Sequence, residues 1–196
     1  MALLKRIGPT EIAGEITLPG VPQSLELIFE TTQPQPSVFQ SDALAAFIDA
    51  WAVQRNAIEC ALYAYYRDTA VGVTESGPFI SNAQSVWQHV SLSHLRVLAG
   101  QQGDLGVTQV TGGCSWEDEH GLELDFLGGI KLIYVGQYDG RGYLPSNVNQ
   151  SWNYASPDVQ QAVFESVDVE VPEPVEESPI QAKIHPEVQK PWWKLW

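Results

Sequence analysis

Hydrophobic and polar positions fall into short strand-like runs over most of the chain, and one long stretch follows a helical period instead. Two runs, "EIAGEITL" (11–18) and "SLELIFET" (24–31), flank Pro19-Gly20-Val21-Pro22. Proline fixes φ and glycine accepts positive φ, so these four residues are typical of a turn. The pattern predicts an N-terminal β-hairpin.

The helical period lies between residues 41 and 67. Ser41 followed by Asp42 is a typical helix start, and the expected helix runs to about Arg67. Apolar residues recur there in steps of three, four or seven, at Leu44, Ile48, Trp51, Ile58, Leu62 and Tyr65. A second, shorter helix is expected over residues 81–90, capped by Ser81 or Asn82.

The pattern returns to strands after residue 90. Strand-like runs occupy 91–99, 105–116, 122–127 and 131–138, and Gly128-Gly129 between the last two is a hairpin signal. Short connections favour antiparallel neighbours. The sequence therefore predicts an α+β fold, with a mostly antiparallel meander packed on one long helix.

The chain changes character near residue 164. We predict a single domain over 1–164, an acidic Pro/Glu-rich linker over 165–190 that is disordered or extended, and a tryptophan-rich anchor over 191–196. The anchor contains Trp192, Trp193 and Trp196, which need a surface to cover them. They are expected to dock on their own domain or form a homodimer, with a foreign protein as a third choice.

The formal net charge of −14 excludes several classes of partner. A polyanionic surface repels nucleic acid and anionic lipid and attracts basic proteins. The N-terminus does not have the pattern of a signal peptide, and no apolar run approaches the ~20 residues of a membrane helix. Two cysteines outside a C-x-x-C pair fit free thiols in a reducing compartment. We expect a soluble cytoplasmic protein.

The segment Trp116–Gly121 is the most concentrated group of candidate functional side chains. In a structural interpretation, Trp116 enters the core, Glu117–Glu119 face water and Gly121 takes positive φ. A protein-binding surface is the first alternative. Acid/base or metal chemistry by Glu117, Glu119 and His120 is the second, although His-Glu-x-x-His is absent. We predict no metal and no cofactor.

Cys114 next to a histidine is the right pair of residue types for nucleophilic catalysis, with His120 or His94 as the base. A cysteine inside a strand is more typical of a small buried hydrophobe. No helix follows Cys114 to lower its pKa. We therefore expect a binding protein and not an enzyme.

The order of these motifs resembles a bacterial family catalogued as a domain of unknown function. Its members have a helix ending in a Leu-x-x-Tyr-Tyr-like segment, a Cys-x-Trp-[Asp/Glu]-x-Glu-His-Gly-[Leu/Ile] strand and turn, and a strand closing on Val-Gly. The resemblance covers roughly residues 10–140. The matching positions are Leu62, Tyr65, Tyr66, Cys114, Trp116, Glu117, Glu119, His120, Gly121, Leu122, Val135 and Gly136. The resemblance implies an immunity factor encoded beside a polymorphic toxin.

We therefore predict a cytoplasmic immunity protein that occludes a cognate toxin or another basic protein. The alternatives are a hydrolase-like or metal-dependent enzyme using Glu119 and His120, and an adaptor acting through its tail. The predicted partner-binding residues are Glu117, Asp118, Glu119, His120, Tyr138, Asp139, Trp192, Trp193 and Trp196.

Overall fold

A seven-stranded sheet forms the centre of the fold, in the spatial order β1-β2-β3-β4-β5-β6-β7. The computed structural model describes residues 4–70, 77–102 and 105–166. The strands are β1 (Lys5–Gly8), β2 (Glu11–Ile16), β3 (Leu25–Glu30), β4 (Val90–Gln102), β5 (Leu105–Cys114), β6 (Glu117–Leu127) and β7 (Lys131–Gly136). Neighbouring strands are antiparallel except β3 and β4, which are parallel. The α+β class and the mostly antiparallel sheet are thus confirmed.

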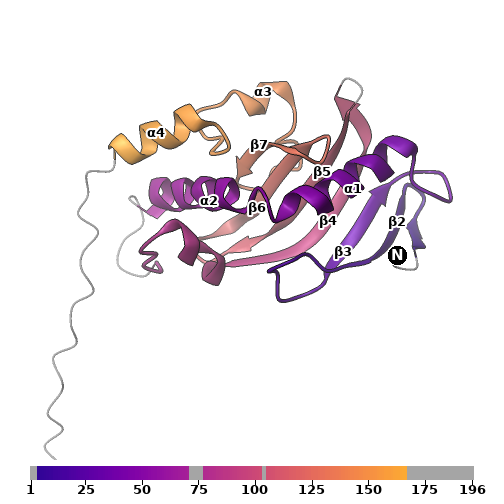
Figure 1. Ribbon diagram of the computed structural model, residues 1–196, viewed down its shortest axis with the longest axis horizontal. Coiled ribbons are helices and arrows are strands. Elements are labelled where there is room, and N and C mark those ends of the chain that lie inside the picture. Colours follow the sequence, from indigo (N-terminus) through magenta and orange to yellow (C-terminus); the bar gives the residue numbers. More distant parts are fainter. Residues whose placement is uncertain (1–3, 71–76, 103–104, 167–196) are drawn as a thin grey trace, which may run out of the picture.

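The parallel pair exists because three helical segments separate β3 from β4. They are α1 (Val38–Trp51), α2 (Arg55–Ala70) and the 3-10 helix η1 (Ala83–His89). A crossover of this length can return the chain to the same end of the sheet. Figure 1 shows α1 and α2 following one another, nearly end to end, across one face of the sheet. We call the opposite face, turned away from α1 and α2, the open face.

The single long helix that we predicted is wrong, because the chain breaks between Trp51 and Arg55. Val53, within this turn, is 84% exposed, and the Gln54 N–H still donates to the Ala50 carbonyl at 2.9 Å. The first helix also begins earlier than Ser41. Ser37 is its N-cap and forms a capping box with Gln40.

The buried face of α1 differs by one position from the predicted one. Ala43, Phe47 and Trp51 are buried, whereas Ile48 is exposed and Leu44 is only partly buried. Phe47 packs on Phe126 of β6 with ring centroids 5.0 Å apart. In α2 the predicted side chains Ile58, Leu62 and Tyr65 are buried as expected.

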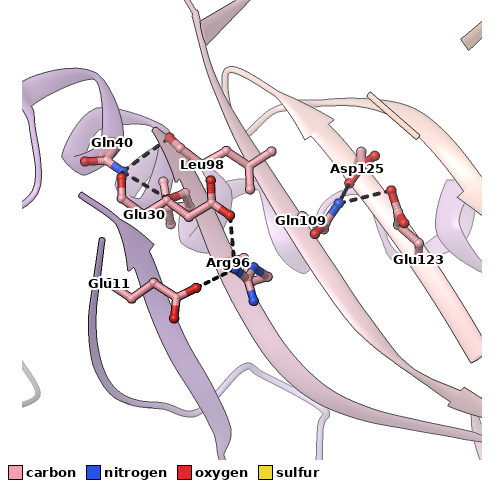
Figure 2. Close-up of polar contacts among 9 residues, drawn as sticks. Glu11, Glu30, Gln40, Arg96, Leu98, Gln109, Glu123 and Asp125 are labelled. Carbon is pink, nitrogen blue, oxygen red and sulfur yellow. Dashed lines mark hydrogen bonds and ion pairs between the residues drawn. The ribbon is translucent and has the colours of Figure 1, made fainter. Parts of the chain in front are cut away.

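Gln40 ties the start of α1 to the sheet. Its Nε2 atom donates to the backbone carbonyls of Glu30, Val97 and Leu98 at 2.9, 3.0 and 3.2 Å. Figure 2 shows the amide reaching both strands, β3 and β4. A buried amide must be hydrogen-bonded, so this contact fixes where α1 starts over the sheet.

Two short helices, α3 (Pro145–Val148) and α4 (Pro157–Ser166), follow the sheet and were not predicted. Helix α4 packs on α2, with the Phe164 and Tyr63 rings 6.2 Å apart. The described fold therefore extends to Ser166, two residues into the predicted linker. The rest of that linker and the anchor 191–196 lie outside the described residues.

The outer edge of β7 is closed by a side chain. Asn153 accepts from the Val135 N–H at 3.1 Å and donates to the Ile133 carbonyl at 2.7 Å. The Tyr154 N–H then donates to the Val135 carbonyl at 2.9 Å. An asparagine side chain thus takes the hydrogen-bonding positions that another strand would use. Among the described residues, no helix is long and apolar enough to span a membrane.

Candidate functional site

The connection between β5 and β6 is the well-packed turn that the structural interpretation predicted. Trp116 is buried against the rings of Tyr65 and Tyr66, with centroids 5.9 and 6.0 Å away. Gly121 has φ +77°. A Cβ there would lie 2.9 Å from the Gly112 carbonyl oxygen, so glycine is required. The predicted structural roles of Trp116 and Gly121 are confirmed.

The predicted full exposure of Glu117 is wrong. Its side chain is only 17% exposed, because the carboxylate turns back over its own turn. Oε1 accepts from the Glu119 N–H at 2.9 Å and lies 3.1 Å from His120 Nδ1. Burial favours a higher pKa for Glu117. Hydrogen bonds from the His120 ring and from the Glu119 and His120 N–H groups outweigh burial and lower that pKa.

The other predicted residues of this turn point outward. Asp118 and Glu119 are exposed, and the His120 side chain is 52% exposed. His120 and Tyr138 line a depression of about 300 Å³ on the open face. They share it with His94, which we had considered only as a base for Cys114, and with Arg96, which we did not predict. The structure therefore brings together only part of the predicted set.

Asp139 belongs to a loop, residues 137–144, that we call the strap. Its side chain is used locally: Oδ1 accepts from the Arg141 N–H at 2.6 Å and Oδ2 from Asn147 Nδ2 at 3.2 Å. Its backbone N–H donates to Glu123 Oε2 at 3.0 Å. Asp139 is exposed, so partner binding by this carboxylate stays a prediction, but it also shapes the strap.

The strap covers a pair of carboxyl groups that have no contact with water. Glu123 and Asp125 are both 0% exposed. Strap N–H groups of Gly140 and Gly142 donate to Glu123 at 2.6 and 2.8 Å. Gln109 Nε2 donates to both carboxyl groups, at 3.0 and 3.1 Å, as Figure 2 shows. A buried carboxylate that accepts several N–H groups is stabilised as an anion.

Asp125 is held in its protonated form. Burial, the negative charge of Glu123 and a hydrogen bond between the two carboxyl groups raise the pKa of Asp125 well above its usual value. Two carboxyl groups this close together do not both ionise readily at a site that excludes solvent. The raised pKa of Asp125 therefore favours a proton on that carboxyl group.

Arg96 joins β4 to its neighbour β3 and to β2 beyond it. Its guanidinium lies 2.7 Å from Glu11 Oε1 and 3.0 Å from Glu30 Oε1 (Figure 2). Glu11 and Glu30 are directly opposite each other in the β2–β3 ladder. Like charges in opposite positions destabilise a sheet, and the Arg96 guanidinium offsets that repulsion.

The same ladder contains a second pair of opposed carboxylates, Glu15 and Glu26. Beside it lies His94, whose Nε2 atom is 3.6 Å from Glu26 Oε2. Histidine carries a full charge only when protonated. Within the described residues, no ion pair involves Glu15. Lys5 lines the same hollow as this second pair, but across the described part of the chain it forms no ion pair with either acid, whereas Arg96 bridges both acids of the first pair.

Cys114 is buried, as predicted for a small hydrophobe, and its Sγ atom donates to the Glu117 carbonyl at 3.4 Å. Burial raises the pKa of the thiol to about 12. The described residues contain no group of three or more His, Cys, Asp or Glu side chains arranged to hold a metal ion. Trp192, Trp193 and Trp196 lie outside the described residues.

Sequence reasoning missed Arg96, Gln109, Glu123 and Asp125. One signal was present: Glu123 and Asp125 alternate with Leu122, Leu124 and Phe126, which places both acids on one face of β6. Alternation predicts a face exposed to water. Their burial depends on a loop that begins more than ten residues later, and no local pattern contains that information.

A mostly antiparallel sheet with helices across one face makes this an α+β protein. The chain belongs to the family described as a domain of unknown function (DUF6985), which matches residues 7–143. The match begins within β1, spans β2 to β7 and most of the strap, and ends before α3. No curated protein and no solved structure matches the chain. The family description assigns no activity.

Proposed function

We propose that the chain is a binding protein that occludes a basic protein partner, in the manner of an immunity protein that neutralises a toxin. The observation that carries this proposal is the second carboxylate pair on the open face. Glu15 and Glu26 repel each other directly across the ladder. Among the described residues their one ion pair joins Glu26 to His94, and Lys5 lines the same hollow without an ion pair to either acid. In the isolated protein this repulsion lowers the stability of the fold, and a cation supplied by a partner would relieve it in the complex.

Two further features support a basic partner. The net charge of −14 accelerates encounter with a positively charged protein. His120 and Tyr138 line the depression that also contains Arg96. This depression gives a partner a concave surface with hydrogen-bonding groups. The immunity role itself rests on the resemblance of the Cys114–Leu122 motif, because the family description assigns no activity.

Co-expression with a toxin encoded beside this gene tests the proposal. The unaltered protein should restore growth, and the double variant Glu15→Lys with Glu26→Lys should not. The matched control is Asp42→Lys with Asp49→Lys, because it makes the same charge change at exposed positions of α1. Failure of the unaltered protein to rescue growth, or equal loss in the control, would overturn the proposal.

The enzyme alternative gains no specific support from the geometry. His120 bonds to Glu117, whereas Glu119 is exposed, and no contact between the Glu119 and His120 side chains is found in the described residues. The adaptor and homodimer hypotheses depend on the tail and remain predictions.

A further inference from the structure

A second pocket, of about 320 Å³, lies away from the carboxylate pairs of the open face. It forms where the last turn of α2 meets the β5–β6 turn, the strap and residues 149–154. Its lining residues are Tyr65, Thr69, Glu117, Gln137, Trp152 and Tyr154. Four separate segments thus contribute side chains to one concavity. The carboxylate pairs that carry the proposed function lie outside this concavity.

We propose that this pocket binds an organic cation, a protonated amine or a guanidinium, presented as a lysine or arginine side chain of a protein partner. Its aromatic walls are the first reason. The Tyr65 and Tyr154 rings lie 5.0 Å apart, and Trp152 is 39% exposed. Trp152 is held edge-on against Tyr134, with centroids 5.9 Å apart. Fixed aromatic rings attract cations through their electron-rich faces, and tryptophan does so most strongly.

Carboxylates at two sides of the pocket are the second reason. Glu117 forms part of the wall and accepts from the Tyr65 hydroxyl at 3.4 Å. The Tyr154 hydroxyl donates to Asp68, which is exposed at the end of α2. Because both tyrosine protons point to carboxylates, the hydroxyl oxygens keep lone pairs for an N–H donor from a ligand. The same negative charges repel an anion.

The end of α2 is the third reason. Thr69 lines the pocket from the last turn of this helix, where the helix dipole has its partial negative charge. The basic residue of that turn, Arg67, is placed elsewhere, with its guanidinium 5.3 Å from the centre of the Phe164 ring. Aromatic rings, carboxylates and a helix C-terminus therefore all favour the same ligand charge.

That the cation comes from a protein rests on the proposed function. That the pocket favours a cation rests only on its lining residues. The probes are acetyl-lysine amide, its neutral analogue acetyl-norleucine amide, and the pentapeptide Gly-Gly-Lys-Gly-Gly. Binding is followed by the shift of the Trp152 indole N–H in two-dimensional NMR spectra. Both lysine probes should saturate this shift, and the norleucine probe should bind at least about tenfold more weakly.

Three variants remove one contribution each: Glu117→Gln, Asp68→Asn and Trp152→Leu. Glu117→Gln and Asp68→Asn should weaken lysine binding. Trp152→Leu should weaken it by about tenfold. Because this variant lacks the indole N–H, its binding is followed on the side-chain amide of Gln137. Asp49→Asn is the matched control, since it removes one negative charge from exposed α1 and should stay within about twofold. Thermal melts identify any variant that fails to fold, and the remaining variants then decide.

Equal binding of the norleucine probe, or equal weakening by Asp49→Asn, would overturn the cation site. Binding of acetyl-lysine amide without the pentapeptide would overturn the protein source alone. Growth rescue that survives Trp152→Leu and Asp68→Asn would separate the pocket from the proposed function. If the pocket binds lysine but the unaltered protein rescues no cell, the cation site stands and the proposed function fails.

Discussion

Glu117 shows how one side chain can belong to a turn and to a pocket at once. Its carboxylate accepts hydrogen bonds from two backbone N–H groups of its own turn and from the Tyr65 hydroxyl. A surface acid without such partners contributes little to stability. The neighbouring Glu119 is exposed and gives a direct comparison within the same turn.

We expect Glu117→Ala to lower the free energy of unfolding by about 1–3 kcal/mol, because several donors lose their ionised acceptor. Glu119→Ala should change it by less than about 0.5 kcal/mol. Urea unfolding of both variants near neutral pH checks the difference. Equal values would mean that the Glu117 contacts contribute nothing to folding.

Asp125 gives a prediction about pH. Its pKa is raised in the folded state, so the folded chain keeps a proton that the unfolded chain releases above about pH 4. The contribution of Asp125 is therefore complete below about pH 4 and is lost as pH rises toward its folded pKa.

Asp125→Asn should remove this loss, because an amide can donate to Glu123 as the protonated acid does. The free energy of unfolding of the variant should fall less between about pH 5 and about pH 8 than that of the unaltered protein. Glu123→Gln serves for contrast and should cost about 2–3 kcal/mol, since strap N–H groups lose an ionised acceptor. A steeper pH dependence in Asp125→Asn would contradict the assignment of the proton.

At the scale of elements, Gly129 controls how closely the β6–β7 hairpin approaches α1. It has φ +72°, and a Cβ there would lie 2.1 Å from the Ala43 carbonyl oxygen. Gly129→Ala should lower the free energy of unfolding by about 3 kcal/mol, from backbone strain and from separation of hairpin and helix. Gly113, in β5, has open space around its Cβ position, so Gly113→Ala should cost less than about 1 kcal/mol. Thermal unfolding measures the difference. Equal melting temperatures of the two variants would contradict this packing.

The two carboxylate pairs between β2 and β3 can be compared by giving the second pair an arginine like the one beside the first. His94→Arg would place a permanent cation beside Glu26 and within reach of Glu15, as Arg96 lies beside Glu30 and Glu11. We expect a gain of about 0.5–1 kcal/mol in the free energy of unfolding. The variant should also bind a basic partner less well, because the carboxylates are already neutralised. A destabilised His94→Arg protein would show that these acids do not repel each other in the fold.

The elements that the sequence predicted well are those whose signal is local. The hairpin around Gly20, the tight turn at Gly128 and Gly129, and the strands of the meander each depend on neighbouring residues, and the structure confirms them. The break after Trp51 was missed because a step of seven residues to Ile58 fits one helix or two equally well. The buried acids of β6 were missed because the strap that covers them is distant in sequence.

At the scale of the whole molecule, net charge should control the rate of association more than the lifetime of a complex. With −14 charges, the association rate constant with a basic partner should fall about tenfold or more between about 50 and 500 mM salt. The dissociation rate constant should change much less. Stopped-flow mixing measures both, and an association rate constant that ignores salt would contradict electrostatic steering.

The asparagine that closes the β7 edge has a consequence for self-association. A sheet with two free edges can add copies at both ends and grow without limit, as fibrils do. Here Asn153 occupies one edge, and among the described residues no strand lies beyond β1 at the other. As far as the described residues go, pairing of two copies through their sheet edges is therefore left to β1 with β1. That junction uses up the free edge of each copy, so assembly by this route ends at a pair.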